Sequence, residues 1–141
     1  MVARCMKMGV WNEHYCDGGS EVIGGELGND EIAAQDSTPY YVYSSATLLR
    51  LLKLFGDALA GMGQLVCFAV KSLSNVAVLK LLGDAGAGMD VVSGGEYLRA
   101  KAAGVSGDKI VFSGIGKTRE EMRLALEGGI RQFNVESAPE M

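Results

Sequence analysis

The chain has 141 residues, a formal net charge of −4 and 48% hydrophobic residues. This length predicts one domain at most, and the composition is typical of folded α/β proteins rather than disordered ones. The absence of a basic run argues against a nucleic-acid partner, and no apolar segment approaches the roughly 20 residues that span a bilayer. The N-terminus lacks the apolar core and cleavage site of a signal peptide, so a cytoplasmic protein without a membrane partner is expected.

The first 37 residues are glycine-rich and become acidic towards their end. A short strand is predicted around residues 10–15, followed by a turn at residues 17–19. Thr38 and Pro39 interrupt the pattern, and a second short strand is predicted over residues 40–43.

The clearest helix is predicted from residue 46 to residue 62, with Ser44 or Ser45 as its N-cap and Gly61 and Gly63 at its end. Its apolar residues recur every three or four positions and form a stripe along one face. The stripe consists of Leu48, Leu51, Leu52, Phe55, Leu59 and Met62.

A lysine follows the next predicted strand, the apolar run Leu65 to Val70. Because strand side chains alternate, Cys67, Ala69 and Lys71 are expected on one face, with the bulkier residues on the other. In a parallel barrel the small side chains would face the interior, and Lys71 would point inward at its rim. The pattern leaves two interpretations open for Lys71: a solvated strand end, or a desolvated amine that attacks a carbonyl to form a Schiff base.

Three further strands are predicted at residues 89–92, 109–112 and 132–135, and helices lie between them. Ser74 is the expected N-cap of the first of these helices, whose inward residues would be Val78, Leu79, Leu81, Leu82 and Ala85. The other two helices should begin at capping boxes, residues 93–96 and 118–121. With strand starts at 65, 88, 109 and 131, the β/α repeat is regular and predicts a parallel sheet. An eight-unit barrel takes about 250 residues, so only its N-terminal half, about four units, is expected here.

Polar residues at the predicted strand ends are candidates for the site. Asp90 shares a face with Val92 and could reach Lys71, where a carboxylate would keep the lysine or its imine protonated, or it could face solvent. The glycine-rich stretches at 93–95 and 113–117 match no strict phosphate-loop spacing and are interpreted as tight turns. Lys117 is expected to be solvated, and three scattered cysteines indicate no zinc site.

The string FAVKSLSN, followed by VAVLKLLGDAGAGMDVVSGGE, resembles the lysine region of the alanine-racemase-like (fold type III) pyridoxal-phosphate decarboxylases. The resemblance continues through GDKIVFSGIGKTREEM and GIRQFNVESAPEM and covers residues 38–141. It implies a partial barrel over 38–141 and, for 1–37, part of the family's β-domain. It also implies that Lys71 carries pyridoxal 5'-phosphate and that Glu96 matches a glutamate near the cofactor, although capping already accounts for Glu96. Asp90, chosen from its position on the strand, is the other candidate cofactor-binding residue. The family usually has Ala-Asn after the lysine, where this chain has Ser72 and Leu73.

Within that family the resemblance is strongest to enzymes that convert meso-diaminopimelate into L-lysine and CO2 and that act as homodimers. Two alternatives stay open: a related decarboxylase of arginine, ornithine or carboxynorspermidine, and an inactive truncated fragment. The family's ring-stacking histidine, main phosphate loop and substrate arginine would lie beyond residue 141. The 141 residues alone are therefore expected to be inactive.

Overall fold

The computed structural model describes residues 15–17, 22–24, 27–28, 34, 39 and 41–140. The chain forms two compact units, Met1–Leu51 and Leu52–Met141. In the first unit, three short antiparallel strands follow one another in space as in sequence: β1 (Tyr15–Asp17), β2 (Val22–Gly24) and β3 (Leu27–Gly28). Most of the strand predicted at 10–15, and most of the turn at 17–19, lie outside the described residues. Of the strand predicted at 40–43, Tyr41 is a bridge residue and residues 42–43 are irregular, whereas residue 40 lies outside the described residues.

Helix α2 (Ser45–Ala58) begins where the sequence predicts and ends earlier. Ser44 is the N-cap, because its Oγ accepts a hydrogen bond from the Thr47 amide at 3.2 Å. The helix ends at Ala58 instead of residue 62 because the amides of Leu59 and Ala60 donate to carbonyls three residues back, which tightens the last turn. On the predicted apolar stripe, Phe55 is 58% exposed. Within the described residues, no helix has the length and apolar character needed to cross a membrane.

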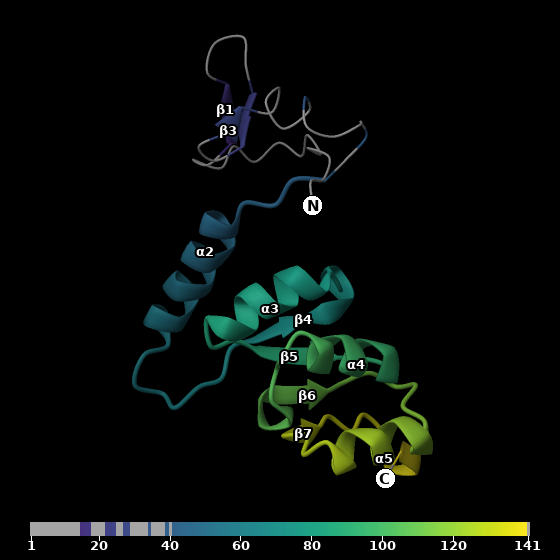
Figure 1. Cartoon of the computed structure of the whole chain (residues 1–141). Coiled ribbons are helices and arrows are strands. Elements are labelled where there is room, and N and C mark those ends of the chain that lie inside the picture. The colour runs from purple at the N-terminus through teal and green to yellow at the C-terminus, as the bar shows by residue number, and fades with distance from the viewer. Residues whose placement is uncertain are drawn as a thin grey trace. The chain divides into compact units, whose positions relative to one another are not determined.

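The second unit contains a parallel sheet of four strands in the order β4-β5-β6-β7 (Figure 1). The strands are β4 (Cys67–Ala69), β5 (Gly88–Val91), β6 (Ile110–Phe112) and β7 (Gln132–Phe133). Helices α3 (Val76–Asp84), α4 (Gly94–Ala102) and α5 (Arg119–Glu127) connect them, and a 3-10 turn, η3 (Ala138–Glu140), follows β7. The predicted α/β fold with four βα units is therefore confirmed, and each strand starts within two residues of its predicted position.

The two faces of this sheet differ in chemistry. Because each strand is added beside its predecessor through a right-handed crossover, α3, α4 and α5 all cover the same face. That face is apolar, and Val70, Met89, Val91, Ile110 and Phe112 are at 0% exposure. Cys67, Ala69, Asp90 and Val111 lie on the opposite face, which α3, α4 and α5 leave uncovered. An eight-stranded barrel has this arrangement, with bulky residues under the helices and smaller ones towards the axis.

Two local predictions need correction. The N-cap of α3 is Asn75 and not Ser74, because the Asn75 Oδ1 atom accepts from the amides of Ala77 (2.9 Å) and Val78 (3.3 Å). Both residue types cap helices well, so the sequence alone did not separate two neighbouring candidates. At the other end of α3, Ala85 was predicted to face inward and is exposed, since the helix ends at Asp84 and the chain turns at Gly86 with a φ of 96°.

Candidate functional site

Lys71 lies at the C-terminal edge of the sheet, in a short 3-10 turn, η1 (Val70–Ser72), that directly follows β4. The turn is held by the Leu73 amide, which donates to the Val70 carbonyl at 3.1 Å, and by Ser72 Oγ, which donates to the Ala69 carbonyl at 2.7 Å. The prediction that Lys71 continues the strand alternation of Cys67 and Ala69 is therefore wrong, because the extended backbone stops at Ala69. Lys71 itself is exposed, so its amine is accessible to a ligand.

The two residues that depart from the family motif have defined surroundings. Ser72 supplies the hydroxyl that closes the turn on Ala69, a bond that alanine cannot make. Leu73 is half-buried, where an amide side chain would have to find a hydrogen-bond partner. The Ser72 hydroxyl and the apolar Leu73 side chain thus stabilise the turn around Lys71, at the two positions where the family usually has alanine and asparagine.

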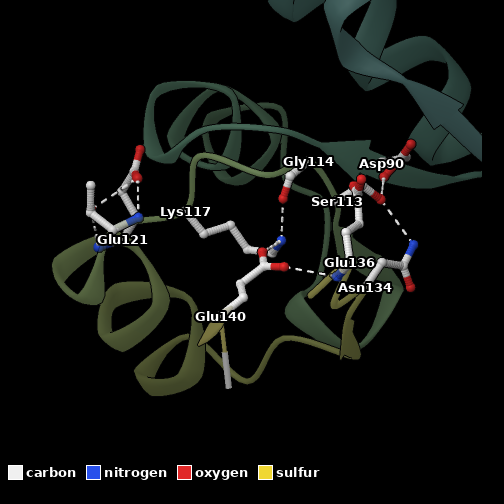
Figure 2. Close-up of polar contacts among 9 residues, drawn as sticks. Asp90, Ser113, Gly114, Lys117, Glu121, Asn134, Glu136 and Glu140 are labelled. Atoms are coloured by element: carbon white, nitrogen blue, oxygen red, sulfur yellow. Dashed lines mark hydrogen bonds and ion pairs between the residues drawn. The ribbon is translucent and has the colours of Figure 1, made fainter. Parts of the chain in front are cut away.

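Asp90 lies on β5, on the face that no helix covers. In the register of the sheet it is side by side with Ala69 on β4 and Val111 on β6. Its carboxylate Oδ1 accepts a hydrogen bond from Ser113 Oγ at 2.5 Å, and Ser113 Oγ accepts one from Asn134 Nδ2 at 2.9 Å (Figure 2). None of the ion pairs within residues 41–140 joins Asp90 to Lys71. The Asp90 carboxylate is therefore held on the β6 side of β5, whereas Lys71 follows β4 on the other side.

Cys67 is the titratable neighbour of Asp90 on this face. Burial raises the pKa of the Cys67 thiol above its usual value, the Asp90 carboxylate raises it further, and Arg131 acts in the opposite direction. A thiol with a raised pKa is a poor nucleophile near neutral pH.

The N-termini of α4 and α5 are occupied by carboxylates of the protein itself. Glu121 Oε2 accepts from the amide and the hydroxyl of Thr118, completing the predicted capping box, and Oε1 accepts from the Gly94 amide at 2.7 Å. The Gly94 and Thr118 bonds lower the pKa of Glu121. A Cβ at position 94 would lie 2.9 Å from Glu121 Cγ, so a larger residue there would displace the Glu121 side chain.

Glu96 is bonded differently from the predicted box. Its amide donates to Ser93 Oγ as expected, but its carboxylate accepts from the Val92 amide at 2.9 Å instead of the Ser93 amide. A phosphate group would need such helix N-terminal amides. The amides of Val92, Gly94 and Thr118 are therefore already bonded to Glu96 and Glu121, and the interpretation of residues 93–95 and 113–117 as tight turns stays a prediction.

Lys117 is buried, and the prediction that it is solvated is wrong. Its side chain is 1% exposed, and its Nζ atom donates to the Gly114 carbonyl and forms an ion pair with Glu140 (Figure 2). The bond from Lys117 lowers the pKa of Glu140, and the Glu136 amide, which donates to the same carboxylate at 2.8 Å, adds to this effect. The pair fixes the loop after β6 against the turn after β7.

Sequence reasoning missed Ser113 and Asn134 as members of the site. Ser113 follows the predicted strand 109–112 by one position, as Lys71 follows the predicted strand 65–70, whereas Asn134 lies inside the predicted strand 132–135 and follows the shorter observed strand β7. That shared position is a usable signal, because the C-terminal ends of parallel strands meet at one edge of a sheet. Lys71, Asp90, Ser113 and Asn134 therefore come from four consecutive strands, or from the turns after them, at one edge.

The described residues fit pyridoxal phosphate in part. The accessible Lys71 amine suits covalent attachment, and Asp90 has a second oxygen, Oδ2, that no bond within residues 41–140 engages. At the N-termini of α4 and α5, the amides of Gly94 and Thr118 already bind the Glu121 carboxylate. Among the described residues, no group of histidine, cysteine and carboxylate side chains is arranged to hold a metal ion.

Comparison with known proteins gives matches to one family over most of the chain. The family model "Pyridoxal-dependent decarboxylase, pyridoxal binding domain" matches residues 45–141. Diaminopimelate decarboxylases of Pseudomonas fluorescens and Zymomonas mobilis are 54% and 53% identical over 87% and 79% of this chain, which covers 30% and 27% of their lengths. The crystal structure of the M. jannaschii diaminopimelate decarboxylase with L-lysine superposes with a TM-score of 0.81 at 34% identity, over 92% of this chain and 31% of that one.

This chain thus spans about 30% of the length of the curated relatives that it matches. The matched region contains the whole parallel sheet, the lysine after β4 and the polar residues at the same edge. From the family model and the site together, the chain belongs to the family of pyridoxal-dependent decarboxylases.

Proposed function

We propose that the chain is part of a diaminopimelate decarboxylase, which removes CO2 from meso-diaminopimelate to give L-lysine with pyridoxal 5'-phosphate as cofactor. The observation that carries the proposal is the accessible Lys71 amine at the C-terminal edge of β4, next to the strand that presents Asp90 on the uncovered face. The names of the relatives support this substrate, and the M. jannaschii relative was crystallised with L-lysine, the expected product.

Lys71 would hold the cofactor covalently through Nζ. When bound, the cofactor supplies a ring that takes up the electron pair left behind as the substrate carboxylate departs. Once an incoming amino acid takes its place, the Lys71 amine can hold and deliver a proton at Nζ. Asp90 places a negative charge at the same edge of the sheet, which favours the protonated form of the Lys71 nitrogen.

Three other lysines of the described sheet unit are poorly placed for this role. Lys117 is buried and paired with Glu140, and Lys80 forms an ion pair with Asp84 at 3.0 Å on the outer surface of α3. Lys101 lies in the last turn of α4, on the opposite side of the sheet from Asp90. Lys71 is the lysine that follows a strand at the edge where Asp90 lies.

The remaining features of the enzyme are proposed from the family. Further chain would close the barrel over the uncovered face and supply the phosphate site, because the N-termini of α4 and α5 are already capped. A homodimer acting in the cytoplasm is proposed on the same resemblance. The proposed partner is an amino-acid substrate.

The test is reduction of the complete gene product with borohydride in the presence of pyridoxal phosphate, followed by peptide mass mapping. We expect the label on Lys71 and formation of L-lysine from meso-diaminopimelate, with arginine and ornithine as comparison substrates. Label on Lys80, Lys101 or Lys117, with Lys71 unmodified, would overturn the assignment. Turnover of ornithine or arginine in preference to meso-diaminopimelate would overturn the proposed substrate, while the assignment of Lys71 as the cofactor lysine would stand.

A further inference from the structure

We infer that Ser113 and Asn134 are positioning residues that hold the Asp90 carboxylate towards β6 and so keep it from forming a direct ion pair with Lys71. The inference rests on the proposed function of Lys71, and it concerns two residues that the sequence did not single out. Both act through Asp90 and belong to the strand ends after β6 and β7.

Three hydrogen bonds form a directed chain that ends on Asp90. Gln132 Nε2 donates to Asn134 Oδ1 at 2.6 Å, Asn134 Nδ2 donates to Ser113 Oγ at 2.9 Å, and Ser113 Oγ donates to Asp90 Oδ1 at 2.5 Å. A hydroxyl has one proton, so a serine that accepts from an amide is left with its proton for the carboxylate. The last bond is charge-assisted and short, as a hydroxyl–carboxylate bond is when it holds an acceptor firmly.

Asp90 lies between strands β4 and β6, so the hydrogen bond from Ser113 decides towards which of the two strands its carboxylate points. On the β6 side its Oδ1 atom is bound by Ser113, whereas on the β4 side lie the Cys67 thiol and, after the strand, Lys71. A carboxylate released from Ser113 would turn towards β4, where the Lys71 ammonium is the opposite charge available to it. An amine engaged in such a pair stays protonated and cannot attack the carbonyl of the cofactor.

A buried ion pair keeps the loop between β6 and α5 in place for this task. Lys117, four residues after Ser113, donates to the Gly114 carbonyl and pairs with Glu140, which also accepts from the Glu136 amide. The residues that follow Ser113 and Asn134 are thereby tied together (Figure 2). Ser113 and Asn134 are therefore held at a fixed separation. The hydrogen bonds from Asn134 to Ser113 and from Ser113 to Asp90 need this separation to stay formed.

The experiment uses the complete gene product and two measurements on the variant Ser113→Ala. The first is the rate at which the unloaded protein takes up pyridoxal phosphate on Lys71, followed by absorbance. We expect it to fall about tenfold, the factor that corresponds to one charge-assisted hydrogen bond. Ser113→Thr, which keeps the hydroxyl, should restore the rate, and Ser106→Ala, the same change in an exposed serine before β6, should leave it unchanged.

The second measurement is site-resolved alkylation of Cys67 in the unloaded protein at fixed pH. A carboxylate that turns towards β4 suppresses the thiolate, so Ser113→Ala should slow alkylation about threefold, equivalent to half a pKa unit. Mere loosening of the sheet would expose the thiol and speed alkylation, which separates positioning from a structural role. Asp90→Asn removes the charge and should speed alkylation.

Unchanged cofactor uptake in Ser113→Ala, or faster alkylation of Cys67, would overturn the inference. Should Ser113→Ala fail to fold, Asn134→Leu removes the preceding donor and is expected to shift both measurements in the same direction. If the wild-type protein takes up no cofactor on Lys71, the proposed function fails. The alkylation measurement in the unloaded protein still decides whether Ser113 holds Asp90.

Discussion

The substitution Glu121→Ala tests how the edge of the sheet that carries the site is held together. One carboxylate accepts three hydrogen bonds there, from the Gly94 amide at 2.7 Å, the Thr118 amide at 3.0 Å and the Thr118 hydroxyl at 2.9 Å. Loss of the capping interaction costs about 1 kcal/mol. Loss of the charge-assisted bond to the half-buried Gly94 amide costs about the same after allowance for partial exposure to water. The expected destabilisation is about 2 kcal/mol.

Hydrogen exchange resolved to short peptides is the assay, because the effect is confined to two helix starts. About 2 kcal/mol corresponds to roughly thirtyfold faster exchange of the amides that Glu121 protects. The peptides to follow cover residues 92–97 and 117–122. Glu120→Ala, a change in the exposed neighbouring glutamate, is the matched control and should leave both peptides as they are.

The same interaction predicts a pH dependence. The bond from Gly94, followed by those from Thr118, lowers the pKa of Glu121 in the folded protein. A lowered folded pKa means that the contribution is fully present above the unfolded value of about 4.3 and is lost as the pH falls through the folded value. The difference between wild type and Glu121→Ala should therefore be complete at pH 7 and shrink below about pH 4. Equal protection in the two proteins at pH 7, or an equal loss in Glu120→Ala, would refute the reasoning.

Three other outcomes are expected. Lys71→Arg in the complete gene product should abolish decarboxylation without loss of folded structure, since a guanidinium stays protonated; turnover within about tenfold of wild type would contradict this. Gly107→Ala should lower the thermal midpoint, because a Cβ there would lie 2.1 Å from the Gly128 carbonyl oxygen, and relief of such overlap costs about 1–3 kcal/mol; Gly56→Ala in α2, with nothing within 4 Å, is the control. The 141-residue chain expressed alone should show no lysine production and poor solubility, because one face of its sheet has no helix over it; a monodisperse, active product would contradict this.

The sequence by itself determined the parallel α/β architecture and most of its element starts. Strand starts near residues 67, 88, 110 and 132 follow from apolar runs, and the capping box of Thr118 and Glu121 is visible as a pattern four residues long. These features depend on interactions between residues close in the chain, and periodicity records such interactions directly. The position of Lys71 at a strand end followed from the same pattern, whereas its place in a 3-10 turn did not.

Only the tertiary structure decided which polar side chains meet. Lys117 and Glu140 are 23 residues apart, as are Asp90 and Ser113, and each pair is formed because the parallel register brings consecutive strand ends together. The sequence read locally assigned Lys117 to solvent, where a charged side chain without a visible partner is most stable, and left Asp90 open between solvent and a position near Lys71. The partner becomes visible once the strands are aligned, because the register fixes which strand ends meet, and side-chain hydrogen bonds form only within about 3 Å.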